Sequence, residues 1–254
     1  MNAKKMLIFA VLAVSLVLSC GGPNAKKLIK MGLYKCHDRL ETAKRDIDRR
    51  AFPNAVRILE EIKFQCGGSP MMDTVYYYAG IAHLRQKQYE DARYEFETLY
   101  REHPRSPFAE EAHFRVAQMR SFQSLAWFRD QTKTREAMRL LTDYVDLYPR
   151  GVYADSARIL FTESLNKLAR KEFSNAIFYR KQREHNAALI YYRAVLSEYP
   201  DSDFAPEAVV GMAEMLLALG RTQDAQEAIE ELEFSAFEEG LRTRLEAVRA
   251  KLKG

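Results

Sequence analysis

The pattern of apolar and polar positions divides the chain into one short apolar run and a much longer amphipathic remainder. Residues 6–18 are almost entirely apolar, whereas the rest consists of long stretches rich in alanine, leucine, glutamate and arginine. Glycine and proline are mostly confined to a few junctions, and no strand-like alternation competes with the helical pattern. Because the abundant residues favour helices and the junction residues interrupt them, the sequence predicts an all-α chain.

Three proline-containing segments repeat in one register: PRSPFAEEA from Pro104, PRGVYADSA from Pro149 and PDSDFAPEA from Pro200. In each segment an aromatic residue lies four positions after the proline, and alanines lie five and eight positions after it. Another alanine lies twelve positions before each proline. Alanine lets two helices approach closely, an aromatic ring fills the next gap, and proline ends a helix. Each repeat therefore predicts one helical hairpin.

This register predicts five hairpins and a closing helix. The expected boundaries are residues 28–67, 70–105, 107–150, 152–201 and 204–234, with the closing helix near 237–252. The spacing from each proline to the next register alanine is longer in the third and fourth units, so we expect both to have lengthened first helices. Three or more such units are enough to bury a continuous core, so a solenoid is expected.

The apolar run at the amino terminus has the features of a secretory signal. Lys4 and Lys5 precede it, and it is shorter than the roughly 20 residues that cross a bilayer. It ends on a small residue before Cys20, a pattern that a lipoprotein signal peptidase recognises. We therefore expect residues 1–19 to be a lipoprotein signal peptide and Cys20 to be lipidated. The alternative is an ordinary signal peptide with an incidental cysteine.

Lipidation would hold the mature chain at a membrane, because two or three acyl chains anchor a protein stably. Gly21 stands where an acidic residue would favour retention at the inner membrane. We therefore expect a location at the periplasmic face of the outer membrane. Residues 20–27 are predicted to form a short lipidated tether.

Charge and cysteine content narrow the possible chemistry. The formal net charge of +4 falls by two when the signal peptide is removed, and so balanced a surface gives no argument for nucleic acid. Cys36 and Cys66 lie at equal distances from a turn near residues 51–53. A disulfide between them is one possibility, but it requires closer packing than the usual 8–10 Å between helix axes. His37 beside Cys36 does not make a zinc site, and we expect no metal and no cofactor.

The residues of the second unit resemble a known repeat. Gly80, Ala92, Phe96 and Pro104 are similar to the small, small, aromatic, proline skeleton of the tetratricopeptide repeat. A degenerate first unit shows the same skeleton through Ala43, Ala55 and Leu59, and the last unit shows it through Ala213 and Ala225.

Two irregular stretches make the resemblance more specific. WFRDQTKTREAMRLLTDYVDLYPRGVYADSA (127–157) and EFSNAIFYRKQREHNAALIYYRAVLSEYPDS (172–202) resemble the BamD family of outer-membrane assembly lipoproteins. In the first stretch an acidic DQT-like turn precedes a helix that Asp130 or Thr132 would cap. In the second, Arg183 stands where the family usually turns on glycine. The similarity covers essentially the whole mature chain.

This resemblance implies a lipid-anchored periplasmic scaffold that helps a barrel-shaped insertase to fold and insert other outer-membrane proteins. In that family the amino-terminal units, here residues 28–150, receive extended segments of unfolded clients. The carboxy-terminal units, here residues 151–254, dock on the periplasmic domains of the insertase. The alternative is a tetratricopeptide adaptor lipoprotein that recruits peptidoglycan hydrolases or envelope-division proteins.

Two groups of candidate site residues follow. The repeat register places Tyr77, Ile81, Leu84, Phe114 and Phe122 on the surface lined by first helices, where they could stack against aromatic residues of a client. The basic face of the fourth unit, Arg180, Lys181, Arg183 and Arg193, is the candidate for partner docking. Ordinary interhelix packing and a solvated surface are the respective alternatives. Tyr191 occupies the position of an arginine that well-known relatives use for barrel contact, so that contact is not carried over.

An enzymatic function is not expected. The sequence contains no GxSxG motif, no cysteine–histidine nucleophile with an orienting third group, and no phosphate-binding glycine loop. Its acidic residues occur at the spacing of helix surfaces rather than as isolated candidates for catalysis.

Overall fold

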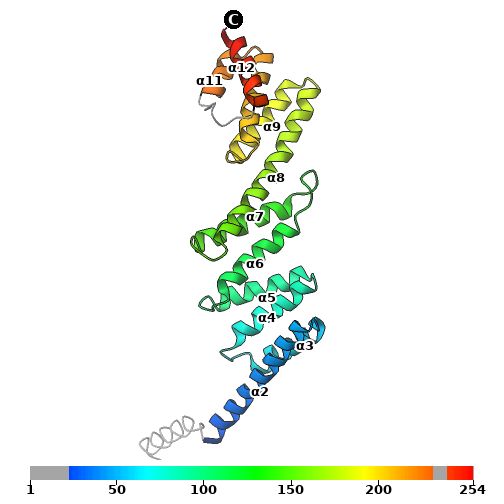
Figure 1. Ribbon diagram of the computed structural model, residues 1–254, viewed down its shortest axis with the longest axis vertical. Helices are drawn as coiled ribbons and strands as arrows, with labels where there is room; N and C mark the ends of the chain where they lie inside the picture. Colours follow the sequence, from blue (N-terminus) through cyan, green and yellow to red (C-terminus); the bar gives the residue numbers. More distant parts are fainter. Residues whose placement is uncertain (1–22, 231–238, 254) are drawn as a thin grey trace, which may run out of the picture. The chain divides into compact units, whose positions relative to one another are not determined.

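The computed structural model describes residues 23–230 and 239–253, and all regular elements within these ranges are α-helices (Figure 1). The predicted signal peptide and the lipidation site Cys20 lie outside the described residues. The first helices are α2 (Pro23–Asp48), α3 (Phe52–Cys66), α4 (Met72–Arg85), α5 (Tyr89–Glu102) and α6 (Ala109–Phe122). They are followed by α7 (Thr132–Leu147), α8 (Ala154–Lys181), α9 (His185–Glu198), α10 (Ala205–Ala218), α11 (Thr222–Glu230) and α12 (Glu239–Lys253). The all-α prediction is confirmed.

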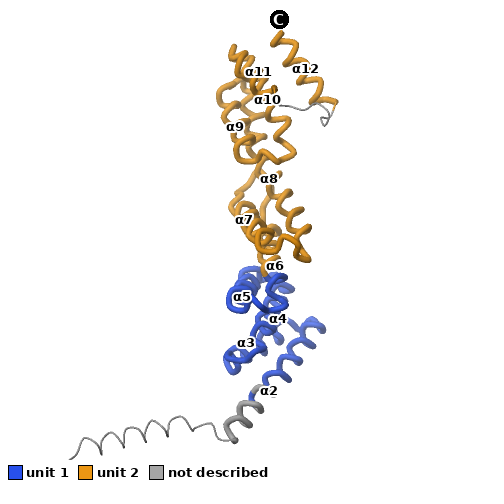
Figure 2. Tube along the Cα trace, turned by 90° about the vertical axis from the view of Figure 1, so that its left-hand side faces the viewer, with its two compact units in different colours: residues 1–112 blue, residues 113–254 orange. Residues whose placement is uncertain are grey.

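The chain divides into two compact units within α6. One unit ends at Ala112 and the other begins at His113 (Figure 2). In the first unit α2 packs on α3, α3 on α4, and α4 on α5; in the second, each helix from α7 to α11 packs on the next, and α12 packs on α10. These are the predicted tetratricopeptide hairpins. The functional boundary predicted at residue 150 lies inside the second unit, and that division of roles stays a prediction.

Four turns within hairpins share one geometry. The second residue after the end of the helix adopts the left-handed conformation, with φ between 60° and 74°, at Arg50, Lys87, Arg183 and Gly220. At the α8–α9 turn, the N–H of Arg183 bonds the carbonyl of Arg180 at 3.1 Å, and the N–H of Glu184 bonds that of Tyr179 at 3.0 Å. This Schellman motif satisfies the last carbonyls of a helix. Only one of the four turns uses glycine, so each of the others carries a steric cost of about 1–2 kcal/mol.

The proline-containing turns between hairpins also repeat. After α5, the N–H of Ser106 bonds the carbonyl of His103 at 2.9 Å, and the N–H of Ala109 bonds that of Ser106 at 3.1 Å. The corresponding bonds after α7 and α9 involve Tyr148, Gly151 and Ala154, and Tyr199, Ser202 and Ala205. The repeated sequence register therefore corresponds to one repeated turn geometry.

The third unit differs from the prediction of a lengthened first helix. Helix α6 has 14 residues, the same length as α4 and α10, whereas α8 has 28 residues as expected for a lengthened helix. The additional residues of the third unit form a loop, residues 123–131, between α6 and α7. The prediction was wrong for this unit because residue spacing fixes only the total length between a proline and the next register alanine. It does not show whether the extra residues continue the helix.

The amino-terminal helix begins earlier than predicted. Helix α2 starts at Pro23, inside the predicted tether of residues 20–27. Proline is well suited to the first turn of a helix, because its missing N–H would have no intrahelical partner there and its φ is already helical. None of the described helices combines the length and the apolar character needed to cross a bilayer.

Glycine allows aromatic rings to fill the space between facing helices. Phe96 on α5 is fully buried against Gly80 of α4, where an added Cβ would lie 2.6 Å from Cε1 of the ring. Tyr192 on α9 is likewise fully buried against Gly211 of α10, where a Cβ would lie 2.5 Å from Cζ. Neither glycine can gain a side chain unless the ring moves, since these contacts are shorter than van der Waals distances.

Candidate functional site

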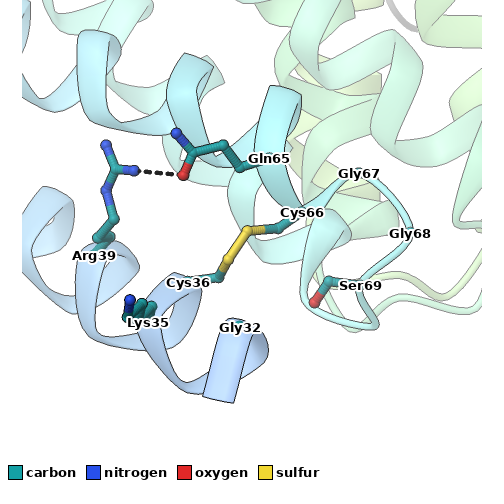
Figure 3. A pocket seen from close by; sticks show the side chains of 9 residues that line it. All are labelled: Gly32, Lys35, Cys36, Arg39, Gln65, Cys66, Gly67, Gly68 and Ser69. Carbon is teal, nitrogen blue, oxygen red and sulfur yellow. Dashed lines mark hydrogen bonds between the residues drawn. A yellow bond between two sulfur atoms is a disulfide. The ribbon is translucent and has the colours of Figure 1, made fainter. Parts of the chain in front are cut away.

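The two cysteines of the first hairpin form a disulfide that joins α2 to α3. The Cα atoms of Cys36 and Cys66 lie 6.6 Å apart, within the range that a disulfide allows. The disulfide lines a pocket together with Gly32, Lys35, Arg39, Gln65, Gly67, Gly68 and Ser69 (Figure 3). In this pocket Nη1 of Arg39 donates a hydrogen bond to Oε1 of Gln65 at 2.8 Å. Ala43 is buried in the same apolar cluster, and its small side chain lets the two helices approach.

Three of the predicted client contacts lie on one face of α4. Tyr77, Ile81 and Leu84 are each half-buried. The ring of Tyr77 stacks on Phe108 with the centroids 4.3 Å apart, and it meets Phe96 edge-on at 6.2 Å. The spacing of four and three residues aligns the three side chains along the helix. This row therefore has apolar surface available, but Tyr77 also has a packing role.

A buried charge cluster in the same unit was missed by the sequence analysis. Nζ of Lys63 lies 2.5 Å from Oε1 of Glu60 and 2.7 Å from Oε1 of Glu95, and the side chain of Glu95 is only 5% exposed. The second oxygen of Glu95, Oε2, is buried without a hydrogen-bond partner. Glu60, His83 and Glu95 offer ligand atoms within 4.8 Å of one another, but the Lys63 ammonium already bridges the two carboxylates.

The electrostatics of this cluster follow from its burial. Burial raises the pKa of Glu95 above its ordinary value, although Lys63 acts in the opposite direction. Burial lowers the pKa of Lys63, but the hydrogen bonds to Glu60 and Glu95 outweigh this effect, so the pKa of Lys63 is raised. Lys63 therefore remains charged and neutralises a carboxylate that is largely removed from water.

The remaining two predicted client contacts belong to the second compact unit and differ from each other. Phe114 is only 3% exposed, and its ring stacks on Tyr153 with the centroids 4.7 Å apart. A client cannot touch this ring unless it displaces Tyr153. Phe122, at the last position of α6, is 65% exposed. The five predicted residues are thus a row on α4, one core residue and one exposed ring.

The loop between α6 and α7 is fixed by a buried glutamine. Nε2 of Gln131 donates hydrogen bonds to the carbonyls of Ala126 at 2.8 Å and Arg129 at 3.2 Å. Oε1 of Gln131 accepts a hydrogen bond from Oγ1 of Thr134 at 2.7 Å. Gln131 occupies the N-cap position of α7 and is fully buried. The DQT-like turn contained this residue, but its position beside a charged residue gave no sign that it would be buried.

Two further contacts complete the support of this loop. The hydroxyl of Ser124 lies 2.6 Å from that of Thr134, and Nζ of Lys167 on α8 donates to Oγ of Ser124 at 2.7 Å. Of the two predicted caps, Asp130 accepts hydrogen bonds from the backbone N–H and the hydroxyl of Thr132, at 3.2 and 2.9 Å. These two bonds lower the pKa of Asp130.

The predicted docking residues surround the turn between α8 and α9. Arg180 is half-buried and its Nη1 lies 3.2 Å from Oε2 of Glu214 on α10, so it is held within the unit. Lys181, Arg183 and Arg193 are exposed. Arg193 lies further along α9, which begins at His185. At about 3.6 residues per helical turn, it is more than two helical turns away from the α8–α9 connection. The structure therefore gathers the first three residues at one turn and leaves Arg193 on the neighbouring helix.

Comparison with known proteins decides the family. Residues 36–232 match the family model YfiO, described as an outer membrane lipoprotein. The chain belongs to the YfiO family. The match begins at Cys36, within α2, and includes all of α3 to α11. It confirms the resemblance that the stretches around Trp127 and Arg183 indicated.

Named relatives of this YfiO-family chain share one description. The chain is 27% identical over 219 residues to the outer membrane protein assembly factor BamD of Caulobacter vibrioides. This alignment covers 86% of the chain and 72% of the relative. The chain is 29% identical over 108 residues to BamD of Xylella fastidiosa, 42% of this chain and 37% of that relative. Among solved structures, a tetratricopeptide repeat protein from Parabacteroides merdae aligns with a TM-score of 0.39 at 14% identity, over 86% of this chain and 85% of that one.

Replacing Arg183 with glycine should stabilise this YfiO-family protein. Arg183 has a φ of 62°, a conformation that costs an ordinary residue about 1–2 kcal/mol and glycine almost nothing. The greater freedom of glycine in the unfolded chain offsets part of this gain, and we expect Arg183→Gly to raise the free energy of unfolding by a net amount of about 0.5–1 kcal/mol. Denaturant titration of the full chain measures this change.

Gly220 provides the matched control, because its φ is 74° and an added Cβ would meet no atom within 4 Å. Gly220→Ala should lower the free energy of unfolding by about 1 kcal/mol through backbone strain alone. A loss of stability in Arg183→Gly would show that the arginine side chain contributes more than its backbone costs.

Proposed function

We propose that this protein is a lipid-anchored periplasmic scaffold of the machinery that assembles β-barrel proteins in the outer membrane. It binds segments of unfolded outer-membrane proteins and the periplasmic domains of the barrel-shaped insertase. The observation that carries the proposal is the YfiO-family match over residues 36–232, together with the BamD relative that aligns over 86% of the chain. A scaffold of this kind holds other polypeptides without any covalent chemistry.

Membrane attachment is proposed through Cys20. The cysteine follows an apolar run that is too short to span a bilayer, and acyl chains on its thiol and amino group would supply the anchor. This assignment is supported by the family description, since the family consists of outer membrane lipoproteins. The location we propose is the periplasmic face of the outer membrane.

Client binding is proposed for the apolar row on α4. Tyr77, Ile81 and Leu84 are half-buried, so each keeps part of its side chain available to an aromatic or apolar segment of a client. Docking of the insertase is proposed for the exposed cations near the α8–α9 turn, Lys181, Arg183 and Arg193. Phe114 and Arg180 are not proposed as contact residues, because the first is buried and the second is paired with Glu214.

Depletion of the protein tests the proposal. Levels of outer-membrane β-barrel proteins should fall while peptidoglycan integrity is retained, and a wild-type copy should restore them. A Cys20→Ser copy should leave the membrane fraction and restore them poorly. Normal barrel levels after depletion would refute the proposal. Recovery of peptidoglycan hydrolases rather than the insertase in a pull-down would favour the adaptor alternative.

A further inference from the structure

The last helix does not continue the stack of hairpins. In the second compact unit α8 packs on α7 and α10 packs on α9, so each of these first helices lies on the second helix before it. Helix α12 instead packs chiefly on α10, which is itself a first helix, and much less on α11 (Figure 2). The surface lined by first helices is the one on which repeat solenoids bind other molecules. Helix α12 therefore covers the last part of such a surface.

One arginine fixes α12 to α10. Nε and Nη2 of Arg244 donate hydrogen bonds to the two carboxylate oxygens of Glu214, both at 2.8 Å. Nη1 of Arg244 donates to Oε1 of Glu207 at 3.0 Å. The paired bonds to Glu214 use the planar fork of the guanidinium, a geometry that lysine cannot reproduce. The attachment is therefore specific for arginine.

The apolar part of the attachment is small. Leu245 and Val248 are the two buried residues of α12, whereas α10 has seven. Leu241 and Leu252 are only partly buried against the same core. Because buried apolar surface is the main force that holds a helix in place, α12 should detach at a lower free energy than is needed to unfold α10.

The face of α10 beneath Arg244 has the features of a guanidinium site. Glu207, Gly211 and Glu214 are spaced by four and three residues, so they share one face of the helix. Gly211 leaves room between the two carboxylates, and an added Cβ there would lie 2.8 Å from the hydroxyl of Tyr192. That hydroxyl is buried and has no hydrogen-bond partner among the described residues. The face therefore presents two carboxylates with an unused hydroxyl behind them.

The charge balance of this face depends on α12. Nη1 of Arg180 on α8 also lies 3.2 Å from Oε2 of Glu214, so two guanidinium groups balance two carboxylates while α12 is attached. Without Arg244, Arg180 remains as the cation beside Glu207 and Glu214, and the face has a net negative charge. The side chains of Glu207 and Glu214 are already 43% and 26% exposed with α12 in place. A cationic group of another chain can therefore reach them and is favoured by charge.

We propose that α12 is a displaceable, autoinhibitory occupant of an arginine-binding site on α10, and that this site takes an amphipathic helix of another protein. The chemistry of the ligand is that of α12 itself, an arginine with apolar side chains one and four positions after it, as in Arg244, Leu245 and Val248. Helices that bind in grooves are recognised through anchors at such spacings. While it is attached, α12 competes from within the chain at the high effective concentration that a tether provides. This inference does not depend on the proposed function.

Hydrogen exchange on the Cys20→Ser chain tests whether α12 detaches. Amides in the middle of α12 should exchange at least tenfold faster than those in the middle of α10. Arg244→Ala combined with Leu245→Ser should remove the protection of α12 and leave α9 and α10 protected. If α10 loses its protection together with α12 in this double variant, α12 is a structural part of the fold and the inference is overturned.

A labelled peptide of residues 239–253 is the probe for the released site, with binding followed by fluorescence anisotropy. It should bind the double variant at least tenfold more tightly than it binds the chain with an intact α12, in which the tethered helix competes. Arg244→Ala in the peptide should weaken binding at least tenfold, and Arg244→Lys should not restore it. Lys251→Ala is the matched control peptide, because it removes the same charge from an exposed position and should bind normally.

Changes in the site itself complete the test. Glu207→Gln combined with Glu214→Gln, added to the double variant, should weaken peptide binding at least tenfold. Equal binding of the Arg244→Ala peptide and the unchanged peptide would overturn the inference, as would a lack of binding to the double variant. Dimers of the wild-type chain in sedimentation that Arg244→Ala abolishes would instead identify the occupant as α12 of a second copy. These measurements do not involve barrel-protein assembly, so this inference and the proposed function can fail separately.

Discussion

Replacing Lys63 with methionine lowers the free energy of unfolding of the first compact unit by about 3–5 kcal/mol at neutral pH, the range for removing one partner of a buried ion pair. Lys63 is the cation that contacts Glu95, whose side chain is 5% exposed and has one oxygen without a hydrogen-bond partner. Without the ammonium, the Glu95 carboxylate must either remain charged in an apolar site or bind a proton. Denaturant titration, monitored through a spectroscopic signal from the first compact unit, measures this loss of stability.

The loss should depend on pH in a direction fixed by Glu95. Burial already raises the pKa of Glu95, and Lys63→Met removes the partner that lowers it. The folded variant therefore holds a proton at pH values where the unfolded chain has lost it, so its stability falls as pH rises above the unfolded value of 4.5. We expect the difference from wild type to be largest near neutral pH and to shrink as the pH approaches that value.

Two control variants isolate the buried charge. Glu95→Gln in the Lys63→Met background removes the unpaired carboxylate and should recover most of the stability, because a neutral pair is often no worse than a buried ion pair. Glu60→Gln should cost under about 1 kcal/mol, because Glu60 is half exposed and its interaction with Lys63 is that of a surface pair. A deficit in Lys63→Met that does not change with pH would show that lost packing, and not the Glu95 charge, is responsible.

The hairpins could be predicted from sequence because their determinants are local. Proline ends a helix wherever it falls in the interior, and alanine at fixed spacing marks a close helix contact. The register of Pro104, Pro149 and Pro200 therefore gave the correct order of helices and the correct turns. Arg183 was identified as a departure from a glycine turn, and it adopts the left-handed conformation that makes glycine common there.

The errors arose where local sequence leaves the outcome to tertiary contacts. Residue spacing could not distinguish a longer α6 from a loop, since the loop depends on hydrogen bonds that Gln131 makes within the folded unit. The register placed Phe114 and Phe122 on one surface, but the ring of Tyr153 stacks on Phe114. Tyr153 comes after α7 in the chain, so the sequence around Phe114 does not show this contact. Lys63 and Glu95 are 32 residues apart, and no periodicity links them.

Removing the disulfide of the first hairpin is the second change that should strongly lower the stability of the first compact unit. Cys36 and Cys66 close a loop with a sequence separation of 30 residues. The loop-closure model predicts a stabilisation of about 3–4 kcal/mol for a loop of this length, because the crosslink restricts the unfolded chain. Cys36→Ala combined with Cys66→Ala should lower the stability of the first unit by about this amount and leave the second unit unaffected.

Hydrogen exchange on the full chain measures both parts of this expectation. Amides in α2 and α3 should lose protection in the double variant, whereas amides in α9, which belongs to the other compact unit, serve as an internal reference. A reducing agent should produce the same change in wild type and none in the variant, which separates the crosslink from the packing of the cysteine side chains. Both cysteines are buried, so a loss of protection in the variant without any effect of reduction in wild type would assign the stability to packing alone. Equal protection in wild type, reduced wild type and the double variant would mean that the apolar cluster around Ala43 holds α2 and α3 together. The bond between the sulfur atoms would then not be needed for this.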